Sequence, residues 1–173
     1  MVNITIDGKS YVAKEGATIL DVARENGILI PTLCFLKEIN EVAACRMCVV
    51  EIKGCERLVA ACNTVIAEDM EIFTASPRVI EARRNNLQLI LSAHDSHCTT
   101  CVRNGNCTLQ TLAKDLNVIE QPYAGKLPKN RWDASLPLIR TDSKCVSCLR
   151  CVNVCDRIQG MNVWDLMGTG GRA

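Results

Sequence analysis

The chain has 173 residues and a formal net charge of +1, with 20 Lys and Arg against 19 Asp and Glu. This balance argues against nucleic acid or an anionic membrane as the partner, and 3% aromatic residues are too few for platforms that stack on single-stranded bases. The unusual feature is the 12 cysteines, for which disulfides, zinc sites and iron–sulfur clusters are the competing explanations.

The N-terminus bears on the choice between disulfides and metal ligands. Residues 1–9 contain no basic region followed by an apolar run, as a secretory signal would. No apolar run approaches the ~18 residues of a membrane-spanning helix. We therefore expect a cytoplasmic protein without membrane insertion, whose thiols stay reduced and act as metal ligands. Iron–sulfur clusters are favoured over zinc, and zinc over disulfides.

Residues 1–13 predict a β-hairpin. Val2, Ile4 and Ile6 alternate with polar residues and face one side, and Asp7-Gly8 has the composition of a two-residue hairpin turn. The returning strand then leads into the next element.

A short helix is predicted next. Thr18 can cap its N-terminus, with Asp21 three residues on as a capping box, and Gly27 is expected to end it in the left-handed conformation. The segment 28–31 then runs extended, because the residue before a proline avoids the α region.

The first cysteine group follows this extended segment. Cys45 and Cys48 are separated by two residues, Cys34 lies before this pair and Cys62 after it. A close pair with one cysteine on either side can surround a two-iron cluster, because each iron takes two thiolates.

The motifs around this group resemble a known family. Gly16-Ala-Thr-Ile-Leu-Asp-Val-Ala, Ile30-Pro-Thr-Leu-Cys34 and Cys45-Arg-Met-Cys48 are similar to the N-terminal ferredoxin-like domain of iron-only hydrogenases. The same domain occurs in the large iron–sulfur subunit of NADH dehydrogenase and in NAD-dependent formate dehydrogenases. The resemblance implies a β-grasp fold and a [2Fe–2S] cluster on Cys34, Cys45, Cys48 and Cys62. Cys55 is outside the pattern and is expected to be a small, partly buried thiol.

Two strands and a long helix complete this part of the chain. The residues between Cys48 and Cys62 predict a hairpin turned at Lys53-Gly54, and residues 70–74 predict a closing strand. Ser76-Pro77 then opens a helix, with a cap followed by an N1 proline, that should extend to about Ala93.

The faces of this helix are predicted from helical spacing. Its buried face should carry Ile80, Leu87 and Leu91. Arg83 and Arg84 should face elsewhere, toward solvent or an acidic partner. His94 follows Leu91 by three residues, so the helix should deliver it from its buried face into the next cysteine loop.

The second group combines His94 with Cys98, Cys101 and Cys107. Four ligands in one compact loop suit a four-iron cubane, and a neutral imidazole should raise its potential relative to a site with four thiolates. Cys101-Val-Arg-Asn-Gly-Asn-Cys107 resembles the motif of the same hydrogenase and NADH dehydrogenase families. In these, a histidine at the position of His94 and three cysteines hold a [4Fe–4S] cluster. His97 is the competing candidate, but it is adjacent to Cys98 and would have to fold back tightly.

A helix and a connector are predicted after this loop. The helix should pack over the cluster through an apolar stripe of Leu109, Leu112, Ala113 and Leu116. Residues 121–139 contain three of the five prolines and predict an ordered connector with little regular structure.

The third group has the spacing of the bacterial ferredoxin run but lacks the proline after its fourth cysteine. Cys145, Cys148 and Cys151 are its predicted ligands, and Cys155 is the candidate fourth ligand. The partner run that would complete such a site is absent from the sequence, so the occupancy of a second [4Fe–4S] cluster stays open. Both a piece of a longer subunit and a naturally short subunit are consistent with this pattern.

The predicted fold class is α+β, in four segments. These are a β-grasp [2Fe–2S] ferredoxin-like domain at 1–76, a helical domain with the histidine-ligated [4Fe–4S] cluster at 77–120, a connector at 121–139 and a partial ferredoxin-like segment at 140–173.

The predicted function is electron relay within a multi-subunit hydrogenase linked to NAD(P), ferredoxin or both. The expected partners are flavin- and NAD(P)-binding subunits and iron–sulfur subunits of the same complex, or ferredoxin. The equivalent segment of a formate dehydrogenase or NADH dehydrogenase is the alternative, and a zinc-binding structural protein is the alternative of another class. The sequence has no Gly-x-Gly-x-x-Gly or P-loop signature, and we expect no catalytic site within it.

Overall fold

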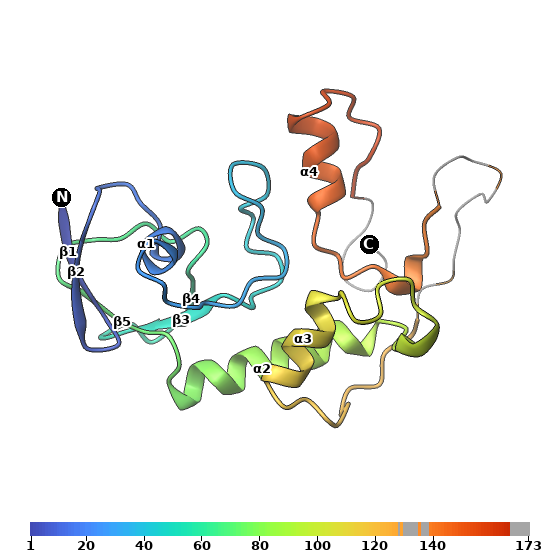
Figure 1. Cartoon of the computed structure of the whole chain (residues 1–173), viewed down its shortest axis with the longest axis horizontal. Helices are drawn as coiled ribbons and strands as arrows, with labels where there is room; N and C mark the ends of the chain where they lie inside the picture. Colours follow the sequence, from blue (N-terminus) through green and yellow to red (C-terminus); the bar gives the residue numbers. More distant parts are fainter. Residues whose placement is uncertain (128, 130–134, 136–138, 167–173) are drawn as a thin grey trace.

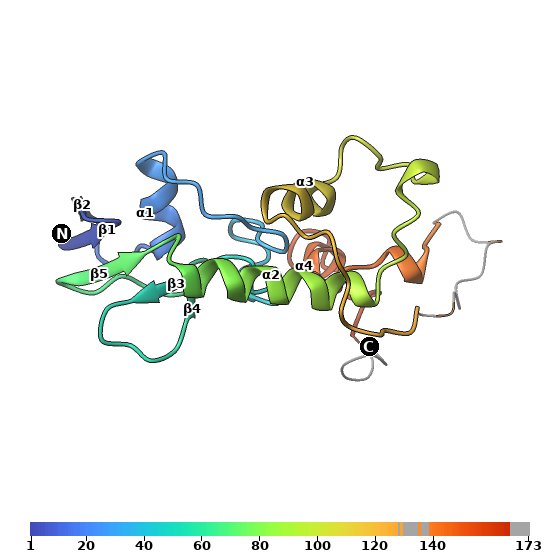
Figure 2. The same cartoon turned by 90° about the horizontal axis from the view of Figure 1, so that it is seen from below.

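The computed structural model describes residues 1–127, 129, 135 and 139–166. A sheet with one short helix forms one end, and a long helix leads from it to the other end, where two further helices lie (Figures 1 and 2). The strands are β1 (Val2–Ile6), β2 (Lys9–Ala13), β3 (Val49–Ile52), β4 (Val59–Ala60) and β5 (Met70–Phe73). The α-helices are α1 (Ile19–Glu25), α2 (Pro77–Ser92), α3 (Thr108–Asp115) and α4 (Arg150–Arg157).

The sheet is mixed, in the order β2-β1-β5-β3-β4. β1 and β5 pair in parallel, with Ile4 opposite Met70, while the other pairs are antiparallel. The chain therefore returns to the centre of the sheet with its last strand, and α2 starts directly beside β3 and β5.

The predicted hairpins and caps are confirmed. Asp7 and Gly8 both have positive φ, 48° and 80°, as a type I′ turn requires. Thr18 and Asp21 form the reciprocal capping box of α1. Gly27 has a φ of 70° just after the helix, and Gly54 turns the β3–β4 hairpin.

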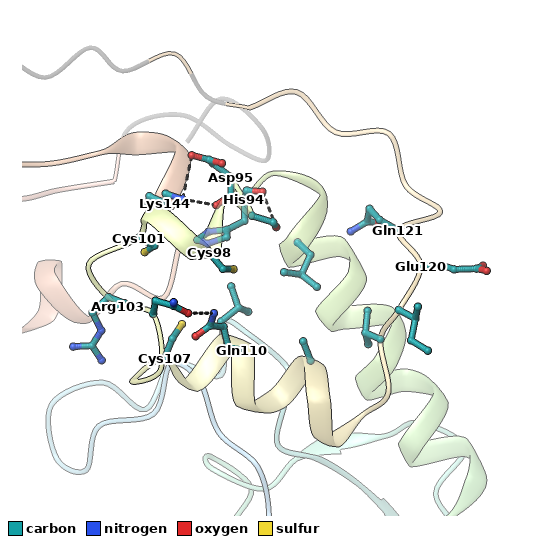
Figure 3. Close-up of a pocket in the computed structure, with 17 residues that line it drawn as sticks. His94, Asp95, Cys98, Cys101, Arg103, Cys107, Gln110, Glu120, Gln121 and Lys144 are labelled. Atoms are coloured by element: carbon teal, nitrogen blue, oxygen red, sulfur yellow. Dashed lines mark hydrogen bonds and ion pairs between the residues drawn. The ribbon is translucent and has the colours of Figure 1, made fainter.

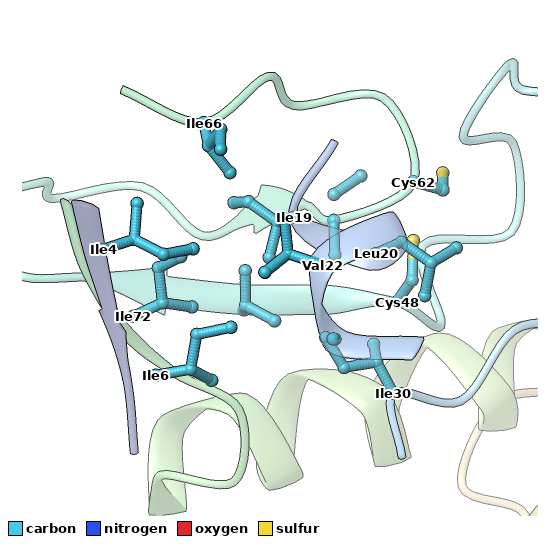
Figure 4. Packing of buried hydrophobic residues seen from close by; sticks show 14 of the residues in the cluster. Ile4, Ile6, Ile19, Leu20, Val22, Ile30, Cys48, Cys62, Ile66 and Ile72 are labelled. Carbon is cyan, nitrogen blue, oxygen red and sulfur yellow. The ribbon is translucent and has the colours of Figure 1, made fainter. Parts of the chain in front are cut away.

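The main core lies between α1 and one face of the sheet (Figure 4). Ile4, Ile6 and Ile72 of the sheet pack against the buried residues of α1, and these three isoleucines are themselves almost fully buried. Cys48 and Cys62 belong to the same buried cluster, at its end nearest to Leu20. Two of the four cysteines of the first group are therefore anchored in this core.

The predicted buried face of α2 is wrong in its first half. Ser76 caps the helix and Pro77 occupies N1, as expected, but the buried residues are Val79, Arg83 and Leu87. Ile80 is 37% exposed, whereas Arg83 is only 5% exposed. The reason is that α2 packs against β3 at this point, and the long Arg83 side chain reaches the carbonyl oxygen of Val49, at 2.8 Å.

A second core joins α2 to α3. Leu87 packs with Leu109 and Leu112, and Ala113 and Leu116 lie against this cluster, so the predicted stripe on α3 is confirmed as an apolar packing surface. In the predicted connector, the described residues 121–127, 129, 135 and 139 form no helix or strand, and the others lie outside the described residues. Among the described residues, every helix is too short or too polar to cross a lipid bilayer.

Candidate iron–sulfur sites

The four cysteines of the first group come together in two pairs. Cys34 contacts Cys45, and Cys48 contacts Cys62. Their residues are buried, with exposed fractions of 1%, 8%, 1% and 0%. Two thiol pairs that are shielded from water provide two ligands for each of two irons, so the residues present fit a [2Fe–2S] cluster.

The protons of these thiols are shared unequally. The hydrogen bond from Cys34 lowers the pKa of Cys45 to about 5, and that from Cys62 lowers the pKa of Cys48 to about 7. The same contacts, followed by burial, raise the pKa of Cys34 and of Cys62. One member of each pair therefore ionises more readily to the thiolate, which is the form that binds iron.

In the loop that carries this group, the backbone donates a hydrogen bond to a cysteine sulfur. Cys34 donates its N–H to the Cys45 sulfur at 3.4 Å. Ala43 and Arg46 both have a φ of 53°, a left-handed conformation that costs a non-glycine residue roughly 1–2 kcal/mol. Such strain persists where a binding loop requires the geometry. Cys55 is exposed, so the prediction of partial burial is wrong, and it lies outside this group.

The second group surrounds a cavity of about 320 Å³ (Figure 3). His94, Cys98, Cys101 and Cys107 line it, and the apolar side is provided by Leu91, Leu109 and Ala113. His94 follows the end of α2, Cys98 opens a short 3₁₀ turn and Cys107 caps α3. Across the described residues, no three His, Cys, Asp or Glu side chains converge tightly enough to hold a single metal ion.

The geometry favours His94 over His97 as the ligand. The Nδ1 atom of His94 is buried and has no hydrogen-bond partner among the described residues. Burial, and then the Lys144 ammonium, lowers the pKa of His94, which favours the neutral imidazole that metals bind. The side chain of His97 is 84% exposed and its Nδ1 is engaged by Asp95. A buried imidazole nitrogen that lacks a hydrogen-bond partner and lies beside three cysteines fits a histidine-ligated cluster.

The cysteines of the third group are less enclosed. Cys145 and Cys151 are exposed, Cys148 is half-buried, and Cys155, on α4, is 2% exposed. Ser147 donates its N–H to the Cys145 sulfur at 3.4 Å and has a φ of 51°. This loop therefore repeats two features of the first group, a residue in the left-handed conformation and a backbone N–H that donates to sulfur, but it is less buried.

Asn40 links the first group to the third. Its side-chain amide donates to the carbonyl oxygens of Cys34, at 2.7 Å, and of Cys148, at 2.9 Å. Its own side-chain oxygen accepts a hydrogen bond from Asn153. Asn40 is fully buried, so its side chain forms a closed polar contact between the two cysteine loops.

Two arginines strengthen the same contact. Arg150 donates from Nε to the Cys34 carbonyl at 3.0 Å and from Nη2 to the Phe35 carbonyl at 2.8 Å. Arg157 donates to the carbonyl of Glu38 at 3.3 Å. α4 is thereby held against the loop that contains Cys34.

The segment that carries the third cysteine group also contacts the second group. Asp95 donates its N–H to the Ser143 carbonyl at 2.7 Å, and Lys144 pairs with the Asp95 carboxylate at 3.1 Å. Hydrogen bonds from His97, and then from Lys144, lower the pKa of Asp95 and keep it charged. Residues 142–157 therefore lie between the two other groups and touch both.

We predict that Asn40→Leu weakens the contact between residues 142–157 and the loop that contains Cys34. The substitution roughly keeps the volume but removes the side-chain donor of the Cys148 carbonyl, while the Cys34 carbonyl keeps its hydrogen bond from Arg150. An unsatisfied buried acceptor costs about 1–3 kcal/mol. A loss of about 2 kcal/mol corresponds to a roughly thirtyfold rise in amide hydrogen exchange for residues 142–157. Asn26→Leu is the matched control, because Asn26 is exposed and its side chain donates to the carbonyl of Val22, within α1. Equal exchange in the two variants would contradict the prediction.

The sequence gives no indication that Asn40 and Arg150 contribute to these sites. A single asparagine in a loop and arginines within helices have no spacing pattern that distinguishes them from surface residues. Their roles depend on contacts between segments far apart in the chain.

Comparisons with known families agree with two of the three sites. Residues 1–77 match the family described as 2Fe-2S iron-sulfur cluster binding domain. Residues 83–122 match the NADH-ubiquinone oxidoreductase-G iron-sulfur binding region. The predicted [2Fe–2S] and [4Fe–4S] binding domains are thereby confirmed.

Individual relatives cover almost the whole chain. The NADP-reducing hydrogenase subunit HndD of Solidesulfovibrio fructosivorans is 43% identical over 98% of this chain, which spans 30% of the relative. The putative formate dehydrogenase YrhE of Bacillus subtilis is 37% identical over 91% of the chain, which spans 16% of it. A crystal structure of an NAD+-reducing [NiFe]-hydrogenase in the H2-reduced state superposes with a TM-score of 0.88 and 28% identity, over 99% of this chain and 72% of that one. The chain therefore carries the N-terminal 2Fe–2S and 4Fe–4S region that NAD(P)-reducing hydrogenase, NADH dehydrogenase G and formate dehydrogenase subunits share.

Proposed function

We propose that this chain is the electron-relay part of an NAD(P)-linked hydrogenase. A [2Fe–2S] cluster would be held by Cys34, Cys45, Cys48 and Cys62, and a [4Fe–4S] cluster by His94, Cys98, Cys101 and Cys107. Bound clusters of these types accept and release single electrons. The chain itself supplies the ligands, excludes water from the first site and fixes the spacing between the sites.

One observation carries this proposal. A single apolar cluster contains the buried Cys34 and Cys45 of the first group, with Cys107 of the second and Cys148 of the third packed against it. Cysteines from all three groups thus share one packed core. Electron transfer requires short separations held by rigid contacts, and a core that joins cysteines of all three groups supports the proposal.

We also propose how the chain divides into domains. A mixed sheet with α1 across one face is consistent with a β-grasp domain over 1–76, followed by the histidine-ligated domain over 77–120 and the connector over 121–139. Residues 140–173 would be a partial ferredoxin-like segment. There, Cys145, Cys148 and Cys151 are the ligands we propose, with Cys155 as the candidate fourth.

The hydrogenase is preferred as the parent because HndD is 43% identical to the chain, against 37% for YrhE. The partners we propose are flavin- and NAD(P)-binding subunits and iron–sulfur subunits of one complex, or ferredoxin. Reduced thiols as ligands are typical of the cytoplasm. The matched families favour iron over the zinc alternative.

A kinetic experiment tests the relay. The anaerobically purified chain is given less than one electron per molecule by a radiolytic pulse, and the absorbance and EPR signals of the two sites are followed. An electron that moves between sites of one molecule gives a rate independent of protein concentration. A rate proportional to concentration would contradict the relay within one chain.

Removal of iron is expected to unfold much of the chain. The sequence has only 3% aromatic residues, and metal ligation contributes free energy of folding in small domains. Treatment with a chelator under reducing conditions should therefore abolish most far-UV circular dichroism at 37 °C. Full retention of helical signal after complete iron removal would contradict this expectation.

A further inference from the structure

Arg83 is a cation that is almost fully buried. It is 5% exposed, on the face of α2 that packs against β3. Nη2 donates to the carbonyl of Val49 at 2.8 Å, while Nε has no hydrogen-bond partner among the described residues. Among the described residues, no carboxylate forms an ion pair with Arg83, although Asp7 and Cys48 are close enough to act on its charge.

A guanidinium in such a position needs a compensating negative charge. Removal of an unpaired charge from water is costly, and buried charges in proteins are normally paired with an opposite charge. Burial lowers the pKa of Arg83 to about 10, while the Cys48 thiolate and Asp7 act in the opposite direction. A guanidinium with this pKa remains charged at neutral pH.

The position of Arg83 identifies the compensating group. The carbonyl that it binds belongs to Val49, the residue directly after Cys48. By formal charges, two ferric irons, two sulfides and four thiolates sum to a dianion, and reduction by one electron makes it a trianion. A fixed cation nearby therefore favours the reduced state, and net charge is one of the factors that set cluster potentials.

We propose that Arg83 is the buried counter-charge of the first cysteine site and raises the midpoint potential of the [2Fe–2S] cluster there. The inference rests on the proposed function, because it requires a cluster on Cys48 and its partners. It assigns to an arginine outside every ligand motif the role of setting how readily this site takes an electron.

An EPR-monitored redox titration of the whole chain tests this role. Arg83→Gln removes the charge but can keep a donor for the Val49 carbonyl, Arg83→Met removes both, and Arg83→Lys keeps the charge. At the wild-type midpoint, each neutral variant should show at least a tenfold lower ratio of reduced to oxidised cluster, which is 59 mV for one electron. Arg83→Lys should stay within threefold of the wild type.

Arg84→Met is the matched control. Arg84 is the next residue on α2 but is half-buried and donates to the Leu116 carbonyl, at 3.1 Å, rather than to the residue after Cys48. Its replacement should leave the ratio unchanged. A neutral Arg83 variant with the same potential as Arg84→Met would overturn the inference.

The remaining outcomes are also decisive. If both neutral variants fail to assemble a cluster while Arg83→Lys succeeds, the positive charge itself is required, which supports the inference. If Arg83→Lys fails as well, Arg83 acts through packing and the inference is overturned. Absence of any [2Fe–2S] signal in the wild-type chain would instead overturn the proposed function.

Discussion

Cys48→Ser is expected to abolish the [2Fe–2S] cluster. Cys48 is 1% exposed, is paired with Cys62 and has its pKa lowered toward the thiolate form. Serine has nearly the same size, but its oxygen is a much poorer iron ligand. The purified variant should lose about two irons per chain and the EPR signal of the reduced two-iron site. The signal of the second site should persist, because its ligands belong to a separate loop.

Cys55→Ser is the control for this experiment. Cys55 lies between Cys48 and Cys62 in the sequence but is exposed, with its thiol near the Arg57 carbonyl. Its replacement should leave iron content and both signals unchanged. Loss of the two-iron signal in Cys55→Ser, or its survival in Cys48→Ser, would show that the ligand set is wrong.

The second large effect is expected at His94. In His94→Ala the cavity loses one of its four proposed ligands, so the four-iron signal should disappear or convert to that of a three-iron cluster. In His94→Cys the cluster should form again with a lower potential, because a thiolate adds negative charge that imidazole does not.

The matched control is His97→Ala. His97 is exposed and contacts Asp95 rather than the cavity, so its loss should alter neither the iron content nor the potential of the second site by more than a small amount. A four-iron signal that survives His94→Ala and vanishes in His97→Ala would reverse the assignment.

Local sequence patterns were sufficient for the elements that frame the sites. The Asp7-Gly8 turn, the Thr18–Asp21 capping box and the cap at Ser76 each depend on residues within a few positions, and all three formed as predicted. Cysteine spacing was equally informative, because ligands of one loop must lie close together. The proposed histidine followed from its position at the end of α2.

Contacts between distant segments could not be predicted. Helical spacing suggested that Ile80 is buried and Arg83 exposed, but the packing of α2 on β3 reverses both. Asn40 and Arg150 join loops more than one hundred residues apart, and no local pattern encodes that contact. The order of cysteine groups in the sequence also differs from their arrangement in space, since the third group lies against the first and the second.

Iron and sulfide analysis, combined with an EPR redox titration of the anaerobically purified chain, tests whether the chain holds both clusters. We expect at least six irons per chain, two on the first site and four on the second, or about ten if the third site is filled. We also expect two reduced-state signals that titrate independently, one lost in Cys48→Ser and the other in His94→Ala. A colourless chain that contains zinc but no acid-labile sulfide would contradict both expectations.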